Sequence, residues 1–256
     1  MQIKIQRWLS LVLVIVALVI GACSRQEAGS QSSTDSSTAA TTSTPVAQAS
    51  SPQLSTLPRL EGKATVVMTV NGSPITIEVN GTDAPVTAGN FVDLVQRGVY
   101  DGLVFHRVVR EPQPFVVQGG DPQGKDSSFP VEGLGTGSFI DPDTSQARYV
   151  PLEIKPEGAT EPIYSKTLEK AGVSKPPVLR HTRGAVAMAR SSPPDSASSQ
   201  FYIALTELPF LDGSYAVFGY VTEGMDVVDK IQQGDRIESA EVTKGIENLK
   251  KPQTSS

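Results

Sequence analysis

Two runs rich in β-branched residues open the folded part of the chain. They lie at residues 64–70 and 75–79, and Asn71-Gly72-Ser73-Pro74 between them is a turn signal. We therefore predict a β-hairpin that begins near Ala64.

A helical period follows the hairpin. Asp83-Ala84-Pro85 is typical of a helix start and Gly98 of a helix end. The apolar stripe between them consists of Val86, Phe91, Leu94 and Val95. A second helix is predicted from Met225 to Gln233, where Gly234 would end it.

Short strand-like runs occupy much of the remaining chain. They lie at residues 103–109, 115–119, 185–189, 201–205, 216–221 and 237–243. Many short strands, two helices and frequent glycine turns predict a β-barrel or a β-sandwich, and spacing alone does not choose between them.

Residues 122–183 carry only scattered apolar groups and are expected to form a long loop region, a kind of segment that is usually functional or mobile. Within it, Asp141-Pro142-Asp143-Thr144-Ser145 resembles the start of a calcium loop. The sixth position is Gln146 instead of glycine and the twelfth is Leu152 instead of glutamate, so we exclude calcium.

The N-terminus has the pattern of an export signal. Lys4 and Arg7 precede an almost unbroken apolar run at 9–20, which is short for a membrane span of about 20 residues. Ile20-Gly21-Ala22-Cys23 resembles a bacterial lipobox, so we expect residues 1–22 to be removed and Cys23 to be acylated. An uncleaved membrane anchor is the alternative. Cys23 is the only cysteine, which excludes an intrachain disulfide.

Composition then divides the rest of the chain. Residues 23–60 are rich in Ser and Thr and are expected to form a disordered, lipid-anchored tether, residues 61–246 the folded domain and 247–256 a flexible tail. Removal of Lys4 and Arg7 with the signal leaves 20 basic residues against 27 acidic ones, a formal charge of −7. We expect no nucleic-acid partner and a location in the bacterial cell envelope, facing the periplasm or an equivalent exported compartment.

Three ordered groups of residues carry the chemistry. The first joins Phe105-His106-Arg107-Val108-Val109 to the segment 115–121, Phe-Val-Val-Gln-Gly-Gly-Asp; the others are Ser199-Gln200-Phe201-Tyr202-Ile203 and Phe210-Leu211-Asp212-Gly213. Together they resemble the cyclophilins, which are peptidyl-prolyl cis-trans isomerases, over about residues 64–245. The resemblance implies a closed eight-stranded antiparallel β-barrel with two capping helices. We also expect a monomer with no cofactor or metal.

The resemblance also assigns roles to single residues. Arg107 matches the catalytic arginine, and Gln118 matches a glutamine that supports it and the substrate. The positions that match the proline pocket are Phe115, Val116, Met188, Tyr202, Phe210 and Leu211. The positions that match the substrate-binding edge, floor and rim are Ala189, Arg190, Gln200 and Tyr215.

These residue types fit the chemistry of an X–Pro bond. Conjugation gives that bond a rotation barrier of about 18–20 kcal/mol, so isomerisation is slow. An apolar slot can hold the proline ring, and a guanidinium, which stays charged, can donate to the amide nitrogen as conjugation is lost.

A lone arginine on a strand is usually a solvated residue, and the aromatic residues could all belong to the core. We assign Phe105 and Phe218 to the core. Because neighbours on a strand face opposite sides, one of Phe201 and Tyr202 should be core and the other groove. His106 points opposite to Arg107 and is assigned a structural role.

The chain departs from the family pattern at Val116, where methionine is usual, and at three further places. Residues 110–114 form a longer link before Phe115, Phe210 stands where tryptophan is frequent, and Tyr215 stands where many members have histidine. Because Phe210 lacks an indole N–H, we predict weaker cyclosporin binding than in family members that have tryptophan at this position.

Two other function classes compete with an isomerase of exported proteins. The first is a chaperone or scaffold that binds proline-containing segments without turnover. The second, a hydrolase or metalloenzyme, is the least favoured, because His106 and His181 are the only histidines and no nucleophile elbow accompanies them.

Overall fold

The computed structural model describes residues 54–252 of the chain. The predicted signal segment, Cys23 and the tether up to residue 53 lie outside this range. Within it, no helix has the length and apolar character needed to cross a membrane.

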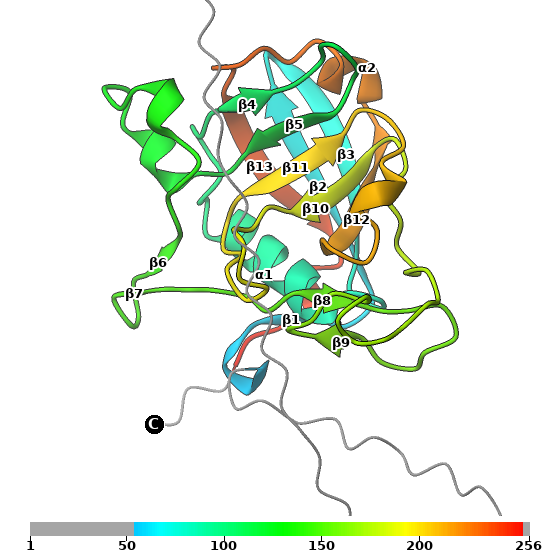
Figure 1. Cartoon of the computed structure of the whole chain (residues 1–256). Coiled ribbons are helices and arrows are strands. Elements are labelled where there is room, and N and C mark those ends of the chain that lie inside the picture. Colours follow the sequence, from blue (N-terminus) through cyan, green and yellow to red (C-terminus); the bar gives the residue numbers. More distant parts are fainter. Residues whose placement is uncertain (1–53, 253–256) are drawn as a thin grey trace, which may run out of the picture. The chain divides into compact units, whose positions relative to one another are not determined.

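An eight-stranded antiparallel sheet forms the centre of the fold (Figure 1). The strand order is β13-β2-β3-β12-β10-β11-β5-β4. The bounds are β2 Lys63–Val70, β3 Ser73–Asn80, β4 Arg107–Val108, β5 Val116–Gly119, β10 Ala185–Met188, β11 Phe201–Ala204, β12 Val217–Glu223 and β13 Ile237–Lys244. The predicted hairpin is β2–β3, whose turn residues Asn71 and Gly72 have φ angles of 50° and 70°.

The sheet curls but does not close into the barrel that was predicted. Its edges, β4 and β13, do not pair with each other. Only a single bridge, Val104 to Arg236, joins the segments just before them, supported by hydrogen bonds such as Phe105 N to Asp235 O at 2.8 Å. The strand predicted at 103–109 is therefore reduced to the two residues of β4. The prediction of a closed barrel is wrong, because β4 is too short to form a ladder with β13.

Two helices, α1 Pro85–Gln96 and α2 Met225–Val228, lie at opposite ends of the sheet in Figure 1. α1 ends where Gly98 adopts a φ of 64°, which lets Val99 N donate to Leu94 O at 3.0 Å. α2 is shorter than the predicted 225–233, because beyond Val228 the backbone turns tightly and Ile231 N donates to the carbonyl three residues earlier.

Aromatic residues fill the core between the sheet and α1. Phe91 of α1 packs against Tyr100, Phe201 and Phe218, with ring centroids 5.1, 5.6 and 4.8 Å away. Phe105 and Phe218 are fully buried, which confirms their assignment to the core.

The folded part extends beyond the predicted boundaries of 61 and 246. The short helix η1 (Leu54–Thr56) leads into β1 (Arg59–Leu60), which pairs with β14 (Leu249–Lys250) after the short helix η5 (Ile246–Asn248). Leu60 is fully buried. Gly89 of α1 permits this close approach, because a Cβ there would lie 2.5 Å from the Cα of Arg59.

Residues 122–183 are built from short elements and are not one long loop. These are the helices η2 Pro122–Lys125 and η3 Val131–Gly133, and the paired strands β6 Ile140–Asp141 with β7 Gln146–Ala147 and β8 Glu153–Ile154 with β9 Ile163–Tyr164. A small apolar cluster of Leu152, Ile154, Leu168 and Ala216 lies beside them. Leu152, Ile154 and Leu168 thus pack locally, whereas Phe139 and Val150 join the main core.

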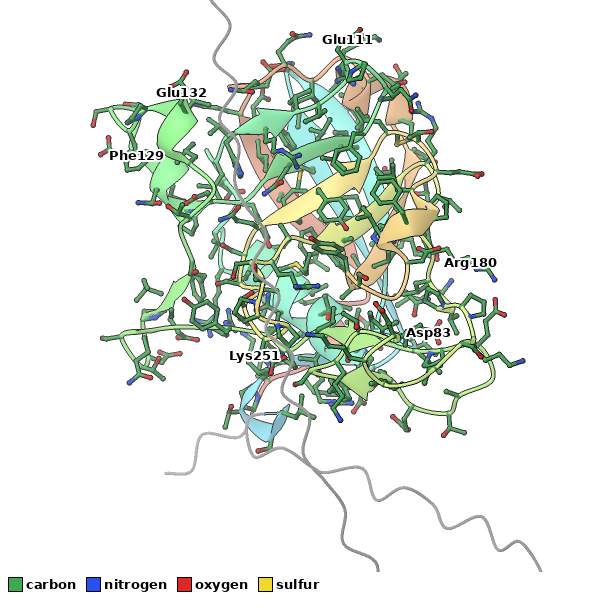
Figure 2. All side chains as sticks on the ribbon, viewed as in Figure 1. Asp83, Glu111, Phe129, Glu132, Arg180 and Lys251 are labelled. Carbon is green, nitrogen blue, oxygen red and sulfur yellow. The ribbon has the colours of Figure 1, made fainter. Side chains whose placement is uncertain are left out.

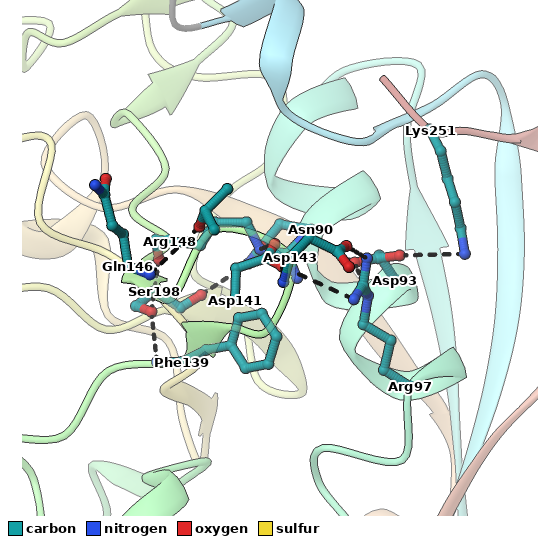
Figure 3. A network of polar contacts seen from close by, with 11 residues as sticks. Asn90, Asp93, Arg97, Phe139, Asp141, Asp143, Gln146, Arg148, Ser198 and Lys251 are labelled. Carbon is teal, nitrogen blue, oxygen red and sulfur yellow. Dashed lines mark hydrogen bonds and ion pairs between the residues drawn. The ribbon is translucent and has the colours of Figure 1, made fainter. Parts of the chain in front are cut away.

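Polar contacts attach this region to α1 (Figure 3). The carboxylate of Asp93 lies 2.9 Å from Arg97 Nε, 2.7 Å from Arg148 Nη1 and 3.6 Å from Lys251 Nζ. Asp141, in the segment that resembled a calcium loop, lies 3.8 Å from Arg148 Nε. At the other end of α1, Glu153 accepts hydrogen bonds from the backbone N–H groups of the first turn.

Candidate active site

Arg107 lies on the edge strand β4, directly opposite Gln118 on β5. Its Nη1 donates to Gln118 Oε1 at 3.3 Å, and its guanidinium lies 5.5 Å from the ring centroid of Phe115. Gln118 Nε2 in turn donates to Gln200 Oε1 at 3.2 Å. The exposed guanidinium is therefore held from two sides at one edge of the sheet.

A groove of about 160 Å³ adjoins this arginine. It is lined by Arg107, Phe115, Val116, Gln118, Ala189, Arg190, Tyr202, Leu211 and Tyr215. All nine are among the twelve catalytic and substrate-binding residues predicted from the sequence. Four separate segments of the chain thus meet at one place.

Strand alternation sorts these side chains. On β5, Val116 and Gln118 face the groove while Val117 belongs to the core. On β11, Phe201 is core and Tyr202 lines the groove, which resolves the alternative left open by the sequence.

Three predicted residues lie elsewhere. Met188 is buried in the core because its side chain leaves β10 on the opposite face, so its assignment to the pocket is wrong. Gln200 does not line the groove, although it contacts Gln118. Phe210 is 69% exposed and stacks on Phe115, with ring centroids 6.1 Å apart. It lies on η4 (Pro209–Leu211), at the outer side of the groove.

Residues 65–251 match the model of one family, described as cyclophilin type peptidyl-prolyl cis-trans isomerase/CLD. The chain belongs to the cyclophilin family. A putative thylakoid lumen peptidyl-prolyl cis-trans isomerase of Synechocystis is 44% identical over 207 residues, which cover 77% of the chain and 51% of that protein. A chloroplastic peptidyl-prolyl cis-trans isomerase of Arabidopsis thaliana is 44% identical over 214 residues, which cover 77% of the chain and 46% of that protein. The chain thus spans about half the length of these two relatives.

A solved structure has the same fold. The cyclophilin type peptidyl-prolyl cis-trans isomerase of Cryptosporidium parvum superposes with a TM-score of 0.53, at 23% identity, and covers 71% of the chain and 98% of its own. At this identity the likeness concerns the fold alone.

The cyclophilin groove continues into a larger cavity of about 540 Å³. Gln118, Ala189 and Arg190 border both, whereas Gln200 lines only the larger cavity. The far wall comes from the 122–183 region and consists of Gly135, Thr136, Gly137, Ser138 and Tyr149. Sequence reasoning gave these residues no role, and the run Gly133-Leu134-Gly135-Thr136-Gly137 was the signal available.

Asp121 fixes this wall in the cyclophilin domain. Its Oδ2 accepts hydrogen bonds from Gly135 N at 2.6 Å and Gly137 N at 2.9 Å. Gly137 O then accepts from Gln200 Nε2 at 2.9 Å, so the wall is joined to the residue that contacts Gln118.

The five-residue link 110–114 is hydrogen-bonded to α2 and the residues that follow it. Arg110 Nη2 donates to Val228 O at 3.2 Å and to Ile231 O at 2.8 Å, and Phe115 N donates to Val109 O at 3.0 Å. Figure 2 shows Glu111 of this link pointing outward. The longer link therefore bulges away while Phe115 stays beside Arg107.

Burial sets the electrostatics around the groove. It lowers the pKa of His106, whose neighbour Arg107 acts in the same direction while Asp121 opposes it. It also raises the pKa of Tyr202, so that hydroxyl stays protonated at neutral pH. The aromatic groove is thus uncharged except for Arg107 and Arg190 at its borders.

Proposed function

We propose that this protein accelerates the cis-trans isomerisation of X–Pro bonds in exported polypeptides. The observation that carries the proposal is the position of the Arg107 guanidinium. It is hydrogen-bonded to Gln118 and lies at the edge of an aromatic groove. Proline-containing peptides are the substrate class that such a groove fits.

The mechanism requires no covalent step. Phe115, Val116 and Leu211 offer apolar surface for the pyrrolidine ring, and Arg107 donates to the amide nitrogen when rotation removes conjugation. That hydrogen bond strengthens only in the twisted amide, so it favours the transition state over the ground state. A thousandfold acceleration would require about 4 kcal/mol, which is plausible for one charged donor.

Relatives support the proposal without settling it. The two at 44% identity are named as peptidyl-prolyl cis-trans isomerases. The family match at residues 65–251 includes every residue that lines the groove. Because the chain covers about half of each, the activity of the full relatives is carried over as a proposal.

An isomerisation assay on a short proline peptide tests it. Arg107→Ala should lower kcat/KM by at least tenfold, because the donor to the twisted amide is lost. Arg180→Ala is the matched control: Arg180 is about half exposed, pairs with Glu157 and projects outward in Figure 2. Full activity in Arg107→Ala contradicts the mechanism, and an inactive wild type that still binds the peptide favours a non-catalytic binder.

The place of action is a second part of the proposal. The lipobox-like Ile20-Gly21-Ala22-Cys23 supports acylation of Cys23 and attachment to a bilayer on the exported side. The names of the thylakoid lumen and chloroplastic relatives fit a compartment outside the cytosol. Cys23→Ser should abolish labelling by a fatty-acid analogue and release the protein from membranes. Unchanged labelling would refute the anchor.

A further inference from the structure

A chain of three polar side chains lies behind the groove. His181 Nδ1 is 2.8 Å from Asp212 Oδ1, and His181 Nε2 is 2.9 Å from the hydroxyl oxygen of Tyr202. Tyr202 lines the groove, whereas His181 is 2% exposed and does not. The hydroxyl of Tyr202 therefore points to a buried partner and its ring borders the groove.

His181 also holds the outer wall of the groove through its backbone. Its N–H donates to Asp212 Oδ1 at 2.8 Å, and its carbonyl accepts from Leu208 N at 2.8 Å. These two partners flank η4, the short helix that carries Phe210 and Leu211. One residue thus connects the floor, on β11, with the wall, on η4.

The proton positions follow from the partners. An ionised carboxylate only accepts, so Nδ1 of His181 carries the proton of a neutral ring, and Nε2 accepts from the hydroxyl of Tyr202. The charged and titratable groups that act here are Asp212 on the histidine, and Arg190, Tyr215 and Asp212 on the tyrosine. Burial lowers the pKa of His181 although Asp212 opposes this, which keeps the ring neutral at pH 7.

On the basis of the proposed isomerase function, we propose that His181 is a positioning residue: it holds the Tyr202 hydroxyl away from the groove and joins floor to wall, so that an aromatic face meets the proline ring. A tyrosine at this position brings a hydroxyl that a phenylalanine would not. Without its acceptor, that hydroxyl would be a buried, unpaired donor beside an apolar ligand, which is unfavourable.

A rescue experiment tests this role. His181→Asn keeps an amide donor near the place of Nδ1 but lacks an acceptor at the place of Nε2. It should raise KM for a short proline peptide about tenfold and change kcat less, because the floor is disturbed and Arg107 is not. Tyr202→Phe in the same chain removes the unpaired hydroxyl and should recover most of the loss. A KM within twofold of wild type in His181→Asn, or no recovery in the double variant, overturns the proposal.

A spectroscopic measurement on the wild-type protein is independent of any substitution at the site. The ¹⁵N shifts of His181 should show a neutral ring protonated at Nδ1 at pH 7. A ring protonated at Nε2, or a charged ring, overturns the proposal. The chain has two histidines, so His106→Asn assigns the signals.

The experiments distinguish failure of the isomerase proposal from failure of the role proposed for His181. If the wild type does not isomerise the peptide, the isomerase proposal falls. The Kd of the same peptide, measured by titration, then replaces KM in the rescue experiment, with the same two outcomes deciding the role of His181.

Discussion

Asp93 Oδ2 and Arg148 Nη1 lie 2.7 Å apart although 55 residues separate them in the chain. Asp93 lies in the last turn of α1, and Arg148 follows β7 in the 122–183 region. Both side chains are buried, at 1% and 8% exposure. Arg148 O also accepts from Ser198 Oγ at 2.7 Å, so this ion pair holds the backbone beside the larger cavity.

Asp93→Ala should therefore be strongly destabilising. Breaking this buried pair leaves Arg148 with only Asp141, 3.8 Å from its Nε, as a carboxylate partner. Loss of a buried ion-pair partner costs about 3–5 kcal/mol. Urea unfolding measures the difference in the free energy of unfolding between Asp93→Ala and the wild type. Lys63→Ala is the control, because the Lys63–Glu78 pair is about half exposed and should contribute less than about 1 kcal/mol. Equal effects of the two substitutions would show that burial of Asp93 does not matter.

Glu153 should make stability depend on pH. Burial raises its pKa above the ordinary 4.5, against hydrogen bonds from Thr87 N, Val86 N and Tyr164. Well below pH 4.5 the carboxyl is protonated in both the folded and the unfolded chain, so its titration does not change the free energy of unfolding. As pH rises, the unfolded chain ionises first, so stability falls until the pH passes the folded-state pKa and then stays level.

Glu153→Gln removes this titration. The difference in unfolding free energy between wild type and Glu153→Gln should therefore shift against the wild type between about pH 4.5 and the folded-state pKa. Urea unfolding at a series of pH values measures it. A constant difference across this range would mean that the pKa of Glu153 is not raised in the folded state.

Phe210→Trp should strengthen cyclosporin binding. Phe210 is exposed beside Phe115, and an indole there adds an N–H donor that phenylalanine lacks. We expect at least a tenfold lower Kd. Trp8, in the predicted signal segment, is the only tryptophan, so the new indole is a single fluorescent reporter once that segment is removed. Nanomolar binding by the unsubstituted protein would refute the premise.

Asp121→Ala should affect longer peptides more than short ones. The substitution frees Gly135 and Gly137, the wall of the larger cavity, while Arg107 and Phe115 keep their contacts. KM for a peptide extended beyond the proline pocket should rise severalfold, and KM for a two-residue peptide should change less. Equal changes for both peptides would place the effect in the groove itself.

Local patterns predicted much of this molecule. The alternation of β2 and β3, the turn at Asn71-Gly72 and the end of α1 at Gly98 depend on neighbouring residues, which the sequence contains. Six of the nine groove residues were found because they lie in the three quoted motifs, and Ala189, Arg190 and Tyr215 were found by matching further positions to the family.

Polar contacts between residues far apart in the chain could not be predicted from the sequence. Asp93 with Arg148, Glu153 with the start of α1 and Asp212 with His181 join residues that share no motif, and a lone charged residue gives no sign of its partner. Met188 was misplaced because a match of position does not say which face of a strand a side chain leaves. The closed barrel was expected from the family resemblance. Closure requires pairing between β4 and β13, which are far apart in the sequence, so no local pattern showed that this pairing is missing.

The pairing of β1 with β14 has a mechanical consequence. The chain that precedes Leu54 enters the fold through β1, whose Leu60 is fully buried and whose two residues are bonded to β14. Tension on that segment would load β1, β14 and their packing on α1 before it reached β4 and β5. The strands that carry Arg107 and Gln118 pair with neither β1 nor β14, so a pull from the N-terminal side should break the β1–β14 pairing before it disturbs the groove.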